Sequence, residues 1–494
     1  MVPGISAKKG DDDGSMMTMM NENATDSESS QVPRNDSFSE IDVDAALAKE
    51  LTKLSCNDRN KVQEEVHGVE FAMPEETPQL IERSLRQLDQ HVQQIASKPA
   101  YDHAVSQLDA SYIQSDAFRT AFVRAAMFDI PQAAQRYTSY LNLLHEFFGD
   151  KGLQRPLQFK DLSKADKDCL KEGRRQILPS RDRSGRLIMF EKGGKPSDTR
   201  HQRVRSRLFI WSILAEDVET QKKGVCGIAE LRPDMFADMT DKEAAADYKA
   251  IMDAIPMRFS AIHLILNFPS GPMVTLIKSA VVMGLFGSQE RVRTKVYEGL
   301  NTEIHYELMT YGIPVQEIPL TSGGNIKTKN LTQWIKTRRA IDNLREEGDT
   351  VAVNLIIAHP NIHDVLFSRG GNPQHLGNKD FHHFLASMND RYNDSSMNRD
   401  NMELIRNELV RSVAAKNGRF LQVRKEGGWW EEIFDQESVH FKINNGFYDH
   451  NRKQKAIQNQ QAMGSSTSEF LESSKRRKIE GQTGCLQNLF GRTM

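Results

Sequence analysis

The most constraining feature of this sequence is the apolar run AIHLILNFPSGPMVTLIKSAVVMGLF at residues 261–286, in a chain of which 27% is charged. A helix that spans a bilayer needs about 20 mostly apolar residues without a break. The passage FPSGP interrupts this run, because proline removes a backbone donor and glycine loosens the chain. The run is therefore expected to form a strand followed by a separate helix, and we expect no transmembrane segment.

Helical and strand patterns alternate around this run. Residues 174–192 have the pattern of a hairpin, and apolar strand patterns recur in GVCGIAEL and FSAIHLILNF, each after a helical segment. Upstream, residues 80–150 show only helical spacing, with Ser115 and Pro131 as helix-start signals. This alternation predicts an α/β fold with a helical N-terminal lobe and a mainly parallel, mixed sheet covered by helices.

Length and composition suggest how the chain is divided. Its 494 residues suffice for two or three domains, and its formal net charge of −2 predicts no general attraction to nucleic acid or acidic lipid. Four scattered cysteines without a CxxC pair favour a reducing, intracellular compartment. The expected order is a disordered acidic segment at 1–75, an α/β domain at 76–345 (helical lobe 80–150, core 155–342), a smaller α+β domain at 355–455 and a disordered tail at 456–494.

Four passages follow one another along the chain: FRTAFVRAAMFDIPQAA, LPSRDRSGRLIMFE, ETQKKGVCGIAEL and IPMRFSAIHLILNFPSGPMVTLIKSAVVMGLF. In that order they resemble the CRAL-TRIO lipid-exchange domain, the fold of phosphatidylinositol- and tocopherol-transfer proteins, over residues 80–342. The resemblance implies a non-enzymatic protein with a bound lipid as its ligand. It also implies that the helix after the Pro/Gly break is a mobile gate over the lipid cavity.

The helix at residues 273–286 is apolar on two sides, which a surface helix does not need. Periodicity alone favours an ordinary buried helix, whereas the resemblance favours the gate of a pocket. The paired glycines Gly323 and Gly324 come later than in the family, so its head-group contacts do not transfer and the ligand stays open. The predicted pocket and gate residues are Ile262, Leu264, Leu266, Phe268, Met273, Leu276, Ile277, Ala280, Val281 and Leu285, with Gly271 and Gly284 as hinges.

The C-terminal part carries a second set of motifs, HDVL, HLGNKDF, GRFL and a late tryptophan. They resemble an uncharacterised domain of algal proteins, of the type HDVLxGRG, HxGNxxF, GRFL and W, although Ser368 stands where glycine is usual. The pattern predicts a strand, two helices, a hairpin and a helix. The matching residues are Asp364, Arg369, Gly370, His375, Gly377, Asn378, Phe381, Gly418, Arg419, Phe420 and Trp430.

Two helices followed by a hairpin are also typical of a winged helix, which would imply a DNA partner. The near balance of acidic and basic residues favours protein interaction or structural packing instead. A basic cluster in the tail is a candidate nuclear import signal or a solvated run: Lys475, Arg476, Arg477 and Lys478. A basic helix is a candidate contact for acidic lipid heads or a solvated face: Arg200, Arg203, Arg205 and Arg207.

The sequence offers no assembled catalytic motif. The loop SRGGNPQHLGN lacks the Lys-Ser/Thr of a phosphate-binding loop, and there is no GxSxG elbow. His375, His382 and His383 have ordinary helix spacing, so we expect no metal and, apart from bound lipid, no cofactor. The leading interpretation is binding, transfer or sensing of a hydrophobic ligand with transient membrane contact. The alternative is a nuclear regulatory protein acting on DNA or protein through its C-terminal domain, with the chain cytoplasmic or partly nuclear.

Overall fold

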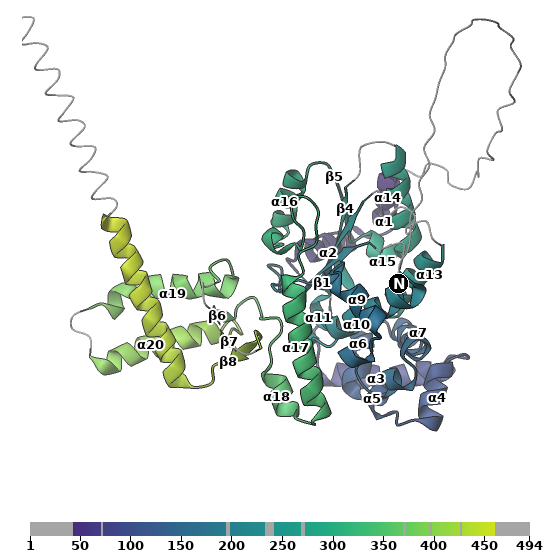
Figure 1. Ribbon diagram of the computed structural model, residues 1–494, viewed down its shortest axis with the longest axis horizontal. Coiled ribbons are helices and arrows are strands. Elements are labelled where there is room, and N and C mark those ends of the chain that lie inside the picture. Colours follow the sequence, from purple (N-terminus) through teal and green to yellow (C-terminus); the bar gives the residue numbers. More distant parts are fainter. Residues whose placement is uncertain are drawn as a thin grey trace, which may run out of the picture. The chain divides into compact units, whose positions relative to one another are not determined.

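A computed structural model of the chain (Figure 1) describes residues 43–70, 73–193, 198–232, 242–267, 272–368, 372–394, 398–424 and 427–459. Side chains are described in these ranges except at 43–44, 272–277 and 280. Within the described part of the chain, no helix has both the length and the apolar character that crossing a membrane requires. The predictions for residues 1–42 and 460–494 fall outside the described residues.

The N-terminal region is helical, as predicted. Its helices are α3 (Pro78–Gln94), α4 (Pro99–Gln107), α5 (Ser111–Gln114), α6 (Asp116–Ala125), α7 (Ile130–Phe148), α8 (Asp150–Gln154), a short 3-10 turn at Phe159–Asp161 and α9 (Lys164–Lys171). Ser115 caps α6 by accepting a hydrogen bond from the amide of Phe118 at 3.3 Å, and α7 ends at Gly149. These start and stop signals confirm the helix boundaries predicted there.

A five-stranded sheet follows, with strands in chain order: β1 (Arg175–Ile177), β2 (Ile188–Lys192), β3 (Val225–Leu231), β4 (Phe259–Leu266) and β5 (Thr294–Glu298). β1 and β2 are antiparallel, and β2 to β5 are parallel. The connections contain α10 (Arg200–Leu214), α11 (Val218–Lys223), α13 (Lys242–Ala254), α14 (Pro272–Leu285) and α15 (Ser288–Arg291). The predicted mainly parallel, mixed sheet is thus confirmed.

One face of the sheet packs against α10, α13 and α14. Right-handed crossovers between strands added in one direction leave the connecting helices on the same face. Ile262, Leu264 and Leu266 lie on this face and share a core with residues of these helices and of α3, α6 and α7. The predicted pocket residues of β4 therefore point together, as the two-residue period of a strand requires.

The opposite face is covered by a segment that was expected to be disordered. Residues 43–67 form α1 (Val43–Thr52) and α2 (Cys56–His67), and Val62 and Val66 of α2 are buried against this face. Glu65 is fully buried and forms ion pairs with Arg258 and Arg293. This burial is the physical reason that the expectation of disorder is wrong for residues 43–67. The same core includes residues of α16 (Asn301–Thr310) and of the stretch around the 3-10 turn Val315–Glu317.

The helices α17 (Lys329–Glu346) and α18 (Thr350–Leu355) precede a smaller α+β part. It contains β6 (Val365–Phe367), α19 (Leu376–Tyr392), α20 (Arg399–Ala414), β7 (Phe420–Val423), β8 (Trp430–Glu432) and a last helix at residues 436–459. β6 and β7 are parallel, and β7 and β8 form an antiparallel hairpin. The predicted order of strand, two helices, hairpin and helix is confirmed, with its own buried core.

Candidate ligand-binding cavity

A cavity of about 120 Å³ lies between the sheet and the helices α10, α13 and α14. Its floor is a row of residues in register across four strands, in which Arg175 pairs with Glu191, Glu191 with Ala229, and Ala229 with Leu264. Neighbouring strands are about 4.8 Å apart, so the row runs roughly 14 Å from its charged end at β1 and β2 to its apolar end at β4. The cavity is therefore amphipathic.

The apolar part of the cavity is lined by side chains from all three helices. Val204 of α10, Tyr248 of α13, and Val281 and Leu285 of α14 line it, together with Phe286 just after α14. An engineered cavity of about 150 Å³ in a protein core binds one benzene molecule, so this volume has room for only a short hydrocarbon segment. A longer hydrocarbon chain lies wholly inside only if a wall of the cavity moves.

The predicted pocket residues divide into three groups. Leu264, Val281 and Leu285 line the cavity, whereas Ile262 and Leu266 are buried in the adjoining core. The side chains of Met273, Leu276, Ile277 and Ala280, and the whole of Phe268 and Gly271, lie outside the described residues. Gly284 is exposed in the last turn of α14, and a side chain added there would meet no atom within 4 Å. The hinge roles of Gly271 and Gly284 stay predictions.

Arg203 and Asp247 also line the cavity, and its charged end is a buried group of three residues, Arg175, Arg207 and Glu191. Arg175 Nε and Arg207 Nη2 both donate to Glu191 Oε1, at 2.9 and 2.6 Å. The exposed fractions of the three residues are 4%, 8% and 7%, so the group is almost withdrawn from water. Its net positive charge is expensive to bury without a further anion.

Two donors in this group are unsatisfied. Arg175 Nη2 and Arg207 Nε have no hydrogen-bond partner among the described residues. Burial, together with the positive charge of Arg207, lowers the pKa of Arg175 despite the nearby Glu191. Burial raises the pKa of Glu191, but the two arginines outweigh burial and the net shift is downward. The carboxylate therefore stays ionised, and the site retains capacity for a second negative group.

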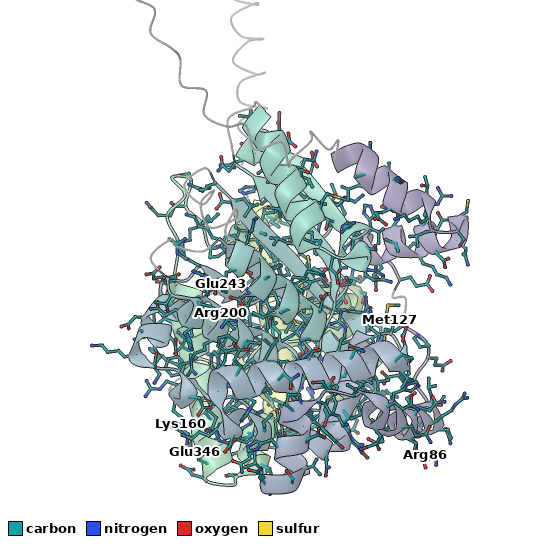
Figure 2. The ribbon with its side chains drawn as sticks, turned by 90° about the vertical axis from the view of Figure 1, so that its right-hand side faces the viewer. Arg86, Met127, Lys160, Arg200, Glu243 and Glu346 are labelled. Atoms are coloured by element: carbon teal, nitrogen blue, oxygen red, sulfur yellow. The ribbon has the colours of Figure 1, made fainter. Side chains whose placement is uncertain are left out.

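Contact of this basic helix with lipid heads stays a prediction, and the expectation of a solvated face holds only in part, because Arg207 is buried whereas the Arg200 side chain is 34% exposed. Arg205 Nε donates to Asp166 at 2.8 Å, and Arg207 is buried beside Glu191. Arg200 forms an ion pair with Asp247 at 2.8 Å and lies near Glu243, as Figure 2 shows. Opposite charges on neighbouring helices and strands draw these side chains inward, and helical periodicity alone does not contain that information.

In the C-terminal part, several motif residues hold the backbone together. Asp364 is fully buried, and Arg419 Nη2 donates to it at 2.8 Å. The side chain of Asn378 accepts from the amide of Leu366 at 2.7 Å and donates to its carbonyl at 3.0 Å, which fastens α19 to β6. Asn378 lies in the first turn of α19, which begins at Leu376 and has His375 at its cap position.

The glycines of these motifs are required by close backbone contacts. A Cβ at Gly377 would meet the carbonyl oxygen of Asp364 at 2.1 Å, and one at Gly418 would meet that of His363 at 2.2 Å. Phe381 and Phe420 are buried in the core, Trp430 is half-buried in β8, and Arg369 and Gly370 lie outside the described residues. The described motif residues thus specify the fold of this part of the chain.

Comparison with known families supports a separate C-terminal domain. Residues 364–447 match the model of a domain of unknown function (DUF6824). The DUF6824 match coincides with the part that resembles an uncharacterised algal domain. No match to the CRAL-TRIO family supports the N-terminal part, and no curated protein matches the chain.

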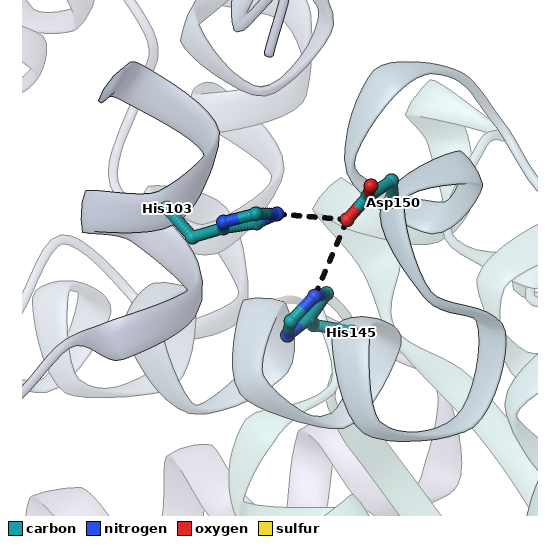
Figure 3. A group of neighbouring side chains, drawn as sticks. All are labelled: His103, His145 and Asp150. Carbon is teal, nitrogen blue, oxygen red and sulfur yellow. Dashed lines mark hydrogen bonds and ion pairs between the residues drawn. The ribbon is translucent and has the colours of Figure 1, made fainter. Parts of the chain in front are cut away.

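Sequence reasoning missed the charged end of the cavity. The available signal was Glu191, a charged residue at an inward position of the apolar strand IMFEK, paired across the hairpin with Arg175. It also missed a cluster formed by His103, His145 and Asp150, which come from α4, α7 and α8 (Figure 3). These residues have no motif spacing, so only the packing of the helices brings them together.

Proposed function

We propose that residues 76–345 bind one amphipathic molecule between the sheet and α14, without catalysing a reaction on it. The observation that carries this proposal is the cavity, whose lining changes from a buried positive group at Arg175 and Arg207 to apolar side chains at Leu264 and Val281. An anionic head satisfies the free arginine donors, and a hydrocarbon part lies against the apolar wall. The ligand class is therefore a hydrophobic acid or an anionic lipid.

The CRAL-TRIO resemblance supports the same location, because it assigns α14 as the gate of a lipid cavity. Each buried methylene group contributes about 0.8 kcal/mol, so a chain of ten groups offsets roughly 8 kcal/mol of the cost of displacing a helix. We propose that α14 opens at a membrane surface, that the ligand exchanges, and that the helix closes over it. Transfer and sensing are both consistent with this cycle.

A cavity-filling variant tests the proposal. Ala245 of α13 lines the cavity, whereas its neighbour Ala246 is exposed on the same helix. Ala245→Trp should abolish saturable binding of a fluorescent fatty acid by the full-length protein, and Ala246→Trp should bind as the unchanged protein does. Equal binding by both variants, or none by the unchanged protein, would contradict the proposal.

We propose a second function for the DUF6824 region, namely contact with a protein partner. Phe441 and Tyr448 are exposed by 63% and 68%, and seven residues separate them on the last helix, so they share one face. Aromatic side chains are enriched at protein interfaces, whereas DNA-binding faces are basic. Salt-dependent binding of the full-length protein to duplex DNA would contradict this assignment.

We further propose that the protein is cytoplasmic with a nuclear pool. The basis is the tail cluster of residues 475–478, which lies outside the described residues. A fluorescent fusion should lose its nuclear signal when these four residues are changed to alanine. An unchanged nuclear signal would remove the cluster as the import signal.

A further inference from the structure

Three potential metal ligands from three helices meet at one point in the helical region (Figure 3). His103 Nε2 lies 2.8 Å from Asp150 Oδ1, and His145 Nε2 lies 3.3 Å from the same oxygen. The centroids of the two imidazole rings are 4.8 Å apart. The three ligand atoms all lie within 4.8 Å of one another.

The backbone places these side chains independently of their mutual contacts. Gly149 ends α7 with a φ of 63°, a conformation that favours glycine, and the chain continues directly into α8. Asp150 is thereby brought back beside His145, in the last turn of α7. α4 packs on α7, and the amide of Ala100 donates to Asn142 Oδ1 at 3.2 Å, which fixes the helix that carries His103. The cluster is therefore preorganised by helix packing.

The two separations from Asp150 suit a tetrahedral ion. Zinc binds imidazole nitrogen and carboxylate oxygen at about 2.0–2.1 Å, which separates neighbouring ligand atoms by roughly 3.3 Å. The separations of 2.8 and 3.3 Å at Asp150 are close to that value. Calcium and magnesium prefer oxygen ligands, and a single carboxylate with two imidazoles offers them too few.

We propose that His103, His145 and Asp150 bind a zinc ion that fastens α4 to the junction of α7 and α8. The exposed fractions of the three side chains are 27%, 40% and 50%, so the fourth coordination position is open to water. The site is separate from the cavity and does not depend on the ligand proposed for it.

Calorimetric titration of the full-length protein with zinc chloride tests the site. His145→Gln and Asp150→Asn should each weaken the saturable binding by at least about tenfold. His91→Gln, which removes a histidine from α3 outside the cluster, should leave the affinity unchanged. Calcium chloride should give no saturable binding. Equal zinc affinity in the unchanged protein and in both cluster variants would overturn the proposal.

A second readout separates ligation from a structural role of the side chains. Zinc should raise the thermal unfolding temperature of the unchanged protein and of His91→Gln, but not that of the cluster variants. Cobalt(II) should acquire the visible absorption of a protein-bound ion in the unchanged protein and lose it in Asp150→Asn, an exposed change that preserves the size of the side chain. The same cobalt spectrum in that variant would also overturn the proposal.

Discussion

At the charged end of the cavity, the buried guanidinium groups of Arg175 and Arg207 both donate to the carboxylate of Glu191. Arg207 lies with its guanidinium carbon 4.9 Å from the ring centroid of Tyr248, so its stem and its charge are both held in place. Arg175 is fixed by Glu191 and by Ser206 Oγ at 3.0 Å. We expect the unsatisfied donors, Arg175 Nη2 and Arg207 Nε, to favour an acid over a neutral lipid.

Arg207→Met should therefore change ligand preference more than it changes the affinity for a neutral chain. Loss of a hydrogen bond to a charged group costs about 2 kcal/mol, or roughly thirtyfold in the dissociation constant. Binding of a fatty acid should weaken by that factor, while binding of the fatty alcohol of equal length stays nearly constant. Competition titrations with the two probes measure the ratio, and an equal loss for both would contradict the role of Arg207.

The buried His263 makes the stability of the fold decrease in acid. It is fully buried, its Nδ1 lies 2.7 Å from the hydroxyl of Tyr297, and burial lowers its pKa to about 3. The unfolded chain binds a proton at this residue below about pH 6.5 and the folded chain does not, so stability falls as the pH decreases from about 6.5 towards 3.

The expected slope is about 1.4 kcal/mol per pH unit from this residue. Urea unfolding between pH 7 and pH 5 measures it, and His263→Phe should reduce the slope by about that amount. The variant is expected to be less stable at pH 7, because the Tyr297 hydroxyl loses its contact with His263. An unchanged slope would contradict protonation of His263 as the cause.

Gly377 leaves no room for a side chain, because a Cβ there would meet the backbone carbonyl of Asp364. Gly377→Ala should destabilise this region by about 3 kcal/mol or more, because either α19 or β6 has to move. Limited proteolysis should then cut residues 372–459 sooner. Ser387→Ala, at an exposed position of α19, is the matched control and should behave as the unchanged protein does.

At the scale of elements, α14 is held by a segment that sequence reasoning assigned to disorder. Arg291 Nε donates to the carbonyl of Phe286 at 2.8 Å, and Arg291 Nη1 pairs with Glu50 of α1 at 3.1 Å. α1 also packs against α14. The proposed gate is therefore fastened at its C-terminal end by α1.

Arg291→Met should loosen this fastening. Loss of the bond to the Phe286 carbonyl costs about 1 kcal/mol, which corresponds to roughly fivefold faster opening. Hydrogen exchange of the amides in Pro272–Leu285 and release of a bound fluorescent fatty acid should both accelerate. Lys53→Met, which removes another partner of Glu50 far more exposed to water, should change neither rate. Equal rates in both variants would contradict the role of Arg291.

Local patterns predicted most elements but not the ion pairs between them. The Pro/Gly break, the cap at Ser115 and the inward face of Leu264 are readable because each depends on neighbours in the sequence. The convergence of Arg175, Glu191 and Arg207 depends on strand register and on a crossover helix. The folding of α2 depends on the ion pairs of Glu65 with Arg258 and Arg293, which lie about two hundred residues away in the sequence. The acidic composition around Glu65 therefore predicted disorder where a helix forms.

At the scale of the molecule, the described residues form three cores. Two lie on the opposite faces of the five-stranded sheet, and the third belongs to the DUF6824 region. The cavity interrupts only the first of these, at the place where α14 meets the sheet. We therefore propose ligand binding at that face, and partner contact for the DUF6824 region.

Native mass spectrometry of the full-length protein purified from cells tests the ligand proposal most directly. We expect one amphipathic acid bound per chain, present in Ala246→Trp and absent from Ala245→Trp. A protein that carries no such molecule and takes up none from anionic vesicles would contradict it, as would the same molecule retained in both variants.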